Sequence, residues 1–169
     1  MIAGAPRREG VSGNAHLVGL ISDTHGLLRP DVFTAFAGVE LILHAGDVGD
    51  DGILDELGMI APTLAVYGNT DPPGHPRLSQ SIELTFGAIR VHVSHGHELG
   101  SPTPAKLLSV YDADVIVYGH THKQLVVKTE GRWVVNPGSA GPRRFDLKPS
   151  VARLTIEGAE VAIDVVELA

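Results

Sequence analysis

The sequence predicts an α/β fold in which strands and helices alternate in the first half and strands dominate the second half. Three observations support this class. Short aliphatic runs in the first half stop at a Gly or Ser and are followed at once by a polar residue, which is typical of buried strands that lead into functional loops. Segments with helical spacing separate these runs, and this alternation favours a parallel sheet with right-handed crossovers. Beyond residue 80 the pattern is richer in strands.

The elements of the first half are predicted from local signals. Three strands alternate with two helices, at 16–22, 30–37, 40–44, 51–57 and 63–67. Pro30 suits the first turn of a helix, and Val32, Phe33 and Phe36 form an apolar stripe on it. Gly58 would end the second helix.

The second half begins with a predicted hairpin and ends with a predicted antiparallel meander. Strands at 81–86 and 89–94 are separated by Gly87-Ala88, and a helix that starts at Pro104 and ends at Tyr111 precedes a strand at 114–118. The tail alternates polar and apolar residues, with turn signals at Glu130-Gly131 and Gly158-Ala159. We expect its four strands, at 124–130, 132–136, 151–157 and 161–167, to form one meander.

Length and composition indicate one domain. The chain has 169 residues and is 43% hydrophobic, enough for one core but too short to make two ordinary domains the better interpretation. Residues 1–15 lack periodicity and are interpreted as a flexible leader to a single domain at 16–169. The sequence has no apolar run long enough for a membrane span and no signal-peptide pattern near its start, so we expect a cytoplasmic protein without membrane association.

Charge and cysteine content limit the ligands. The formal net charge of −7 argues against a long nucleic-acid partner, whereas a small phosphate-ester substrate remains compatible if metal ions supply local positive charge. The sequence contains no cysteine and nine histidines. Any metal must therefore be held by nitrogen and oxygen ligands.

Seven potential metal ligands follow the predicted strands. Five stand directly at strand ends, and two histidines lie two residues further on; the set is Asp23, His25, Asp47, Asn69, His95, His120 and His122. In open α/β sheets the loops at the carboxyl ends of the strands converge. Each residue alone is better explained as a turn or a structural histidine. Their regular position after successive strands makes coincidence the poorer explanation for the set.

These residues lie in motifs that resemble those of the calcineurin-like metallophosphoesterases, especially the small single-domain branch with YfcE-type phosphodiesterases and the retromer subunit. The matching segments are SDTHG (22–26), HAGD (44–47), YGNTD (67–71), SHGH (94–97), YGHTH (118–122) and NPGS (136–139). They occur in family order across almost the whole chain beyond the leader. The resemblance implies a four-layer αββα sandwich, in which two mixed β-sheets are flanked by helices.

The resemblance also implies how the ligands are divided between two divalent ions. Asp23, His25 and His122 would bind the first ion, and Asn69, His95 and His120 the second. Asp47 would bridge both ions, and with Asn69 and His95 it is a catalytic candidate. Imidazole and carboxylate ligands suit Mn, Fe, Zn, Ni or Co, and the resemblance favours Mn²⁺.

The expected activity is metal-dependent hydrolysis of phosphate esters, with phosphodiesters as the first choice. A hydroxide that bridges the two ions would attack phosphorus in line. Many related phosphodiesterases carry a histidine where this chain has Thr70, and threonine cannot protonate a leaving group near neutral pH. We therefore expect a preference for substrates with good leaving groups.

Other roles in the site remain open at this point. His44 and His97 adjoin ligands and are better interpreted as supporting residues than as ligands. Asp71 is equally well a turn residue. Arg143 and Arg144 would reach a substrate phosphate, or they are a solvated pair.

Two alternative functions also remain. The first is a phosphomonoesterase or nucleotide phosphatase with the same metals. The second is a metal-binding scaffold with little catalysis, because the retromer subunit keeps most of this ligand pattern. A homo-oligomer is compatible with the sequence.

Overall fold

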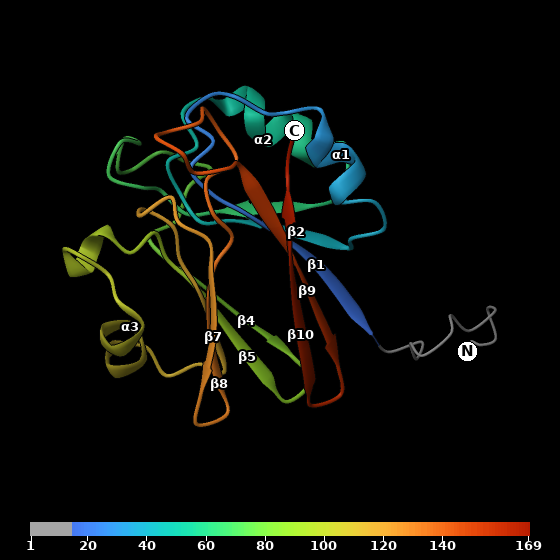
Figure 1. Ribbon diagram of the computed structural model, residues 1–169, viewed down its shortest axis with the longest axis vertical. Coiled ribbons are helices and arrows are strands. Elements are labelled where there is room, and N and C mark those ends of the chain that lie inside the picture. The colour runs from blue at the N-terminus through green and yellow to red at the C-terminus, as the bar shows by residue number, and fades with distance from the viewer. Residues whose placement is uncertain (1–14) are drawn as a thin grey trace.

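Two five-stranded β-sheets pack face to face between helices in the computed structural model, which describes residues 15–169 (Figure 1). This is the sandwich that the motif resemblance implies, and that prediction is confirmed. The leader predicted for residues 1–15 lies, apart from Ala15, outside the described residues. Among residues 15–169, none of the helices could span a membrane.

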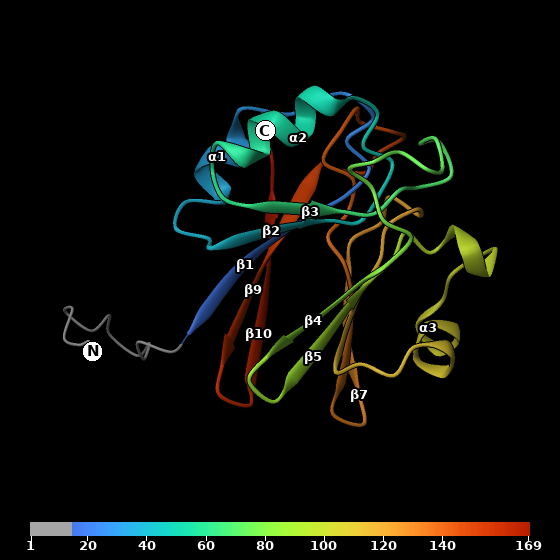
Figure 2. The same ribbon diagram turned by 180° about the vertical axis from the view of Figure 1, so that it is seen from behind.

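The first sheet is built from the parallel strands predicted in the first half. Its strand order is β10-β9-β1-β2-β3. The parallel strands are β1 (His16–Ile21), β2 (Leu41–His44) and β3 (Thr63–Ala65). Helix α1 (Asp31–Ala35) connects β1 to β2, and α2 (Asp51–Gly58) connects β2 to β3. Both helices cover the outer face of this sheet (Figures 1 and 2).

The second sheet has the order β4-β5-β6-β8-β7. Its predicted hairpin is present as β4 (Ile82–Phe86) and β5 (Ile89–Val93), which pair antiparallel. A short 3-10 helix, η1 (His97–Leu99), and α3 (Pro104–Val110) lead to β6 (Val115–Val117), which runs parallel to β5.

The predicted meander of the tail is wrong. Strand β7 (Leu125–Thr129) pairs with β8 (Arg132–Asn136) in the second sheet, whereas β9 (Ser150–Glu157) pairs with β10 (Glu160–Glu167) in the first. Residues 137–149 cross from one sheet to the other. The physical reason is that β8 pairs in parallel with β6, whereas β9 pairs antiparallel with β1. Each hairpin therefore completes a different sheet.

Side chains point alternately to the two faces of each strand, and the buried apolar ones form three core clusters. Val18 and Leu20 of β1 point to the layer between the sheets, where they pack with Val91 and Val93 of β5. Outside the first sheet, Ile21 packs with α1 and α2. The apolar stripe predicted for α1 is only partly correct, because Val32 and Phe36 are buried while Phe33 is 39% exposed. The third cluster lies beneath α3, around Leu107, Ile116 and Val134.

Candidate metal centre

The carboxyl ends of strands from both sheets meet at one edge of the sandwich, and the loops that follow them converge there (Figure 2). The first sheet contributes the residues after β1, β2 and β3. The second contributes those after β5 and β6. All seven predicted ligands lie in these loops, namely Asp23, His25, Asp47, Asn69, His95, His120 and His122.

Five of these residues adopt the left-handed backbone conformation. Their φ angles are 55° at Asp23, 46° at His25, 56° at Asp47, 72° at His120 and 66° at His122. In the described part of the chain, only two other residues besides glycine have positive φ. This conformation is uncommon for residues with a side chain, costs about 1–3 kcal/mol at each position, and concentrates at functional sites. The fold therefore holds these side chains in orientations that relaxed turns would not give.

The first group of converging side chains contains Asp23, His25 and His122. Their potential ligand atoms all lie within 4.8 Å of one another. The Nε2 atom of His122 is 3.3 Å from Oδ1 of Asp23, and Nε2 of His25 is 3.9 Å from the same oxygen. That oxygen and the His25 Nε2 atom are buried and have no hydrogen-bond partner. Buried polar atoms are rarely left unpaired, and together these atoms offer the ligands that a transition metal prefers.

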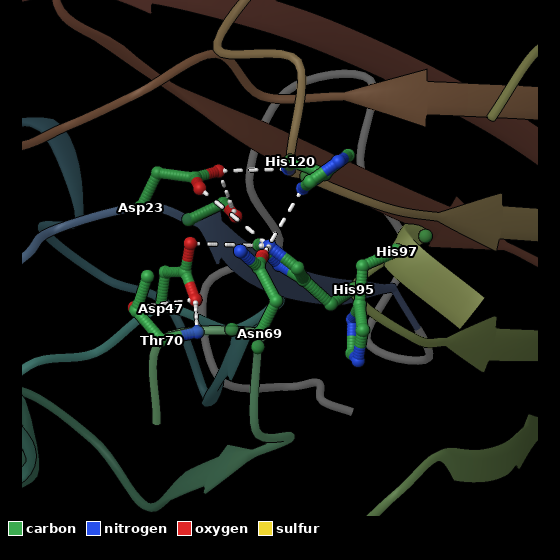
Figure 3. Close-up of polar contacts among 12 residues, drawn as sticks. Asp23, Asp47, Asn69, Thr70, His95, His97 and His120 are labelled. Carbon is green, nitrogen blue, oxygen red and sulfur yellow. Dashed lines mark hydrogen bonds and ion pairs between the residues drawn. The ribbon is translucent and has the colours of Figure 1, made fainter. Parts of the chain in front are cut away.

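Asp47 lies beside Thr70 in the constellation (Figure 3). Its Oδ1 atom accepts hydrogen bonds from the backbone N–H of Thr70, at 2.9 Å, and from the Thr70 hydroxyl, at 2.7 Å. Its Oδ2 atom lies 3.3 Å from Nε2 of His95 and 3.7 Å from Nε2 of His25. One oxygen is thus fixed by Thr70, while the other faces histidines of both predicted groups. This arrangement suits a bridging carboxylate.

Asn69 joins the two histidines of the other predicted group. Its Oδ1 atom is 3.1 Å from Nε2 of His95 and 3.1 Å from Nδ1 of His120 (Figure 3). On the far side of the His95 ring, Nδ1 lies 2.7 Å from the carbonyl oxygen of Ala45. We assign the ring hydrogen to Nδ1, where it is donated to that carbonyl. The assignment leaves the Nε2 lone pair free to bind a cation.

A further set of ligand atoms within 4.8 Å of one another comes from Asp23, Asp47 and His95. Asp23 therefore lies within reach of both groups, whereas the motif resemblance assigns it to the first ion alone. Its Oδ2 atom accepts hydrogen bonds from the Ser22 hydroxyl, at 2.7 Å, and the His120 backbone, at 3.1 Å. These bonds fix the carboxylate so that Oδ1 faces the centre.

Charge within the centre favours ionised carboxylates. Burial by itself raises the pKa of Asp23, but the neighbouring His122 and the charge of His95 bring it below its ordinary value. Burial also acts to raise the pKa of Asp47, where His95 and Thr70 nevertheless bring it well below its usual range. Burial lowers the pKa of His95, but Asp47 and Asp23 outweigh it and raise that pKa. A cation bound to His95 displaces a proton, so metal affinity should fall as the pH falls.

The glycines of the Gly-ligand pairs have a packing role. A Cβ on Gly68 would lie 2.1 Å from Oδ1 of Asp47, and one on Gly119 would lie 2.0 Å from the Ser22 hydroxyl. A Cβ on Gly46 would lie 2.6 Å from Nδ1 of His95. Each glycine therefore lets a side chain from a neighbouring loop pack against bare backbone. The turn interpretation of these pairs misses this contact.

Asp71 is a supporting residue whose role the sequence left undecided. It is buried, and its carboxylate accepts hydrogen bonds from the backbone N–H groups of Val48, at 3.0 Å, Gly49, at 3.1 Å, and Gly68, at 3.0 Å. The first two follow Asp47, and the third precedes Asn69. Asp71 thus ties the loop after β2 to the loop after β3. Its position two residues beyond a ligand is the only signal in the sequence.

Replacing Asp71 by Asn should weaken metal binding and the fold together. The amide keeps one acceptor oxygen and turns an N–H₂ group towards backbone donors. Losing hydrogen bonds to a charged group costs about 1.5–3 kcal/mol of unfolding free energy. Metal affinity should fall about tenfold, as for other residues that orient ligands. Urea unfolding and calorimetric titration with Mn²⁺ measure both effects, and Asp55→Asn, on the exposed side of α2, is the control. Unchanged affinity in Asp71→Asn would contradict this role.

His44 is a structural residue beneath the centre, as predicted. It is fully buried. Its Nδ1 atom accepts a hydrogen bond from the backbone N–H of Gly46, at 3.1 Å, and its Nε2 atom lies 2.9 Å from the Thr24 hydroxyl, which itself donates to the Val48 carbonyl oxygen. These partners require the neutral ring with its hydrogen on Nε2. Burial lowers the pKa of His44 from 6.5 to about 4.

His44 should make the protein less stable in mild acid. Below its ordinary pKa of 6.5 the unfolded chain takes up a proton there, whereas the folded chain does so only near 4. The free energy of unfolding therefore falls as the pH drops through this window, by about 2 kcal/mol between about pH 7 and pH 5. His44→Gln should remove about that much of the pH dependence in urea titrations with chelator present. An equal pH dependence in wild type and His44→Gln refutes the assignment.

The arginine pair predicted to reach substrate is exposed. Arg143 lines a cavity of about 450 Å³ together with Arg29, Lys148 and Leu168. Within residues 15–169 neither guanidinium contacts a predicted ligand. Substrate binding by Arg143 and Arg144 stays a prediction.

The NPGS turn, by contrast, supports the centre. Ser139 donates its hydroxyl hydrogen to the Asp23 carbonyl, at 3.0 Å. Asn136 donates to the carbonyl of Gly119, at 3.0 Å, and to the Thr121 hydroxyl, at 3.1 Å. The turn therefore fixes the loops that carry Asp23 and His120.

Comparison with known proteins links this geometry to a family. Residues 17–159 match the model of the calcineurin-like phosphoesterase superfamily domain. The chain is 36% identical over 159 residues to a probable metallophosphoesterase of Methanothermobacter thermautotrophicus, covering 89% of this chain and 91% of the relative. It is 27% identical to a phosphodiesterase of Methanocaldococcus jannaschii, covering 72% and 82%. The crystal structure of Entamoeba histolytica Vps29 complexed with zinc superposes with a TM-score of 0.73 at 25% identity, covering 90% and 99%.

Proposed function

The chain belongs to the calcineurin-like phosphoesterase superfamily, and we propose that it is a phosphodiesterase that requires two divalent metal ions. The observation that carries this proposal is the convergence of the seven predicted ligands, all with nitrogen or oxygen donor atoms, from both sheets at one edge. The residues suit such ions because Oδ1 of Asp23 and Nε2 of His25 are buried without a hydrogen-bond partner. The phosphodiesterase relative and the zinc-bound neighbour support the same conclusion.

In this proposal Asp23, His25 and His122 hold one ion, and Asn69, His95 and His120 hold the other. Asp47 would be shared by the two ions. When bound, two divalent ions would acidify a water molecule between them and provide the nucleophile for in-line attack on phosphorus. The two aspartates leave excess positive charge at the centre, which attracts the phosphodiester anion.

The chain's own residues set the limits of this chemistry. Thr70 directs its N–H and its hydroxyl to Asp47, and it cannot protonate a leaving alkoxide near neutral pH. Esters with good leaving groups should therefore react faster than alkyl esters. Mn²⁺ is the proposed ion, with Fe, Zn, Ni and Co as competitors for the same mixed ligands.

Metal reconstitution tests the proposal. Protein stripped with chelator should be inactive, bind two equivalents of Mn²⁺, and then hydrolyse bis(p-nitrophenyl) phosphate faster than p-nitrophenyl phosphate. The reverse preference would indicate a phosphomonoesterase. Tight binding of two ions without hydrolysis of either ester would favour the scaffold function. The structural likeness to Vps29 is the reason for including this alternative.

A further inference from the structure

We propose that His97 is a substrate-binding residue that donates a hydrogen bond to an oxygen of the substrate phosphate. The proposal rests on the phosphodiesterase function above. It concerns a residue outside the set of seven metal ligands. It also identifies which side of the centre the substrate occupies.

His97 lies beside two histidines of the centre. Its ring centroid is 5.4 Å from that of His95 and 6.4 Å from that of His120, and these two rings are 5.2 Å apart. The three imidazoles therefore form a triangle, with Tyr67 flanking His97 at 6.3 Å. Figure 3 shows His97 next to His95, on the side away from Asp23. A phosphate oxygen bound near His95 and His120 would thus face His97.

His97 is the one histidine outside the predicted ligand set whose side chain forms no hydrogen bond within residues 15–169. The chain has nine histidines, and four are predicted ligands. The four others with hydrogen bonds to neighbouring groups are His16, His44, His75 and His92. An imidazole that is partly exposed beside a charged centre, and has no bonding partner, is available to a ligand.

The direction of the available N–H follows from burial. The Nδ1 atom of His97 is buried without a hydrogen-bond partner, and the nearest carboxylate oxygen, on Glu98, is 3.8 Å away. A hydrogen on Nδ1 would have no acceptor within bonding distance, so we assign it to Nε2. The side chain is 28% exposed, although its Nδ1 atom is buried. His97 can therefore donate to a substrate oxygen through Nε2.

The loop that carries His97 is fixed in place. Glu98 accepts a hydrogen bond from the backbone N–H of Gly96, at 2.9 Å, and another from the Tyr111 hydroxyl, at 2.7 Å. Gly96 itself has a φ of 106°, which favours glycine. These contacts anchor η1 to the end of α3. His97 thus lies on a preorganised turn, so little entropy is lost when it binds substrate.

Removal of the imidazole tests the proposal with two independent measurements. In Mn²⁺-loaded protein, His97→Ala should raise the KM for bis(p-nitrophenyl) phosphate and the Kd for inorganic phosphate, measured by calorimetry, by about tenfold or more. Metal stoichiometry should stay at the wild-type value. His97→Gln places an amide N–H near the position of Nε2 and should recover most of the phosphate affinity. His75→Ala, whose ring contacts Asp51 instead, should behave as wild type.

The outcomes separate this inference from the proposed function. Loss of bound metal in His97→Ala would show a ligand and overturn the inference, as would wild-type phosphate affinity. Equal defects in His97→Ala and His97→Gln, with metal retained, would also overturn hydrogen bonding as the role. If wild-type protein hydrolysed no ester, the proposed function would fail, while the phosphate titration would still decide whether His97 binds the anion.

Discussion

Asp47→Asn is expected to abolish metal-dependent hydrolysis, with a fall in kcat on the order of a thousandfold. The reason lies in Thr70, whose N–H and hydroxyl both donate to Oδ1 of Asp47. These donors require an acceptor, so the amide oxygen of the substituted side chain must take the Oδ1 position. The amide N–H₂ group is then forced into the Oδ2 position between His25 and His95. There it offers hydrogens where a shared ligand needs a negative charge.

Metal analysis and kinetics check this expectation together. The variant should bind fewer than two Mn²⁺ ions per chain and should unfold in urea close to wild type, because the shape of the side chain is kept. Asp146→Asn, on an exposed loop, is the matched control and should keep both ions. An Asp47→Asn protein with two tightly bound ions and half of the wild-type activity would show that this carboxylate is not the bridge.

Gly68→Ala should also disable the centre, although no ligand is changed. The added Cβ would lie 2.1 Å from Oδ1 of Asp47 and 2.5 Å from its backbone nitrogen, so the loops after β2 and β3 must separate. Overpacking of this kind costs about 1–3 kcal/mol of unfolding free energy. A displacement of catalytic groups by about 1 Å can cost on the order of a hundredfold in rate.

A second glycine provides the control for this variant. A Cβ added to Gly58, the last residue of α2, would meet no atom within 4 Å, so Gly58→Ala should keep full activity and gain up to about 1 kcal/mol of stability. Comparing kcat, metal affinity and urea midpoints of the two variants separates the steric effect from the general effect of replacing glycine. Full activity in Gly68→Ala would mean that the loops adapt without moving Asp47.

The sequence was sufficient to locate the strands and the residues that follow them. Each predicted ligand stands at or just beyond a strand end because aliphatic runs mark buried strands, and the α/β order brings their carboxyl ends together. The partners of the tail strands were not predictable in this way. Periodicity indicates that β7 to β10 are strands, but which sheet each hairpin joins depends on contacts with β1 and β6, far away in the sequence.

The supporting residues were less predictable than the ligands. Asp71 looks like a turn residue, and only the structure shows three backbone donors around its carboxylate. Gly68 likewise looks like part of a turn until the Asp47 side chain is seen against it. Both roles depend on contacts between loops at the edge of a sheet. No local sequence pattern predicts which loops come into contact.

Five predicted ligands share a strained left-handed backbone, namely Asp23, His25, Asp47, His120 and His122. Their strain lowers the thermal stability of the protein, while their side chains are needed for activity. Glycine relieves this conformation at little steric cost, so glycine at any of these positions would ease the backbone while deleting a ligand. Laboratory evolution that selects for thermal stability alone should therefore yield variants that have lost the metal centre. Variants improved for both properties should instead carry their changes in the helices and sheet faces, away from the five strained positions.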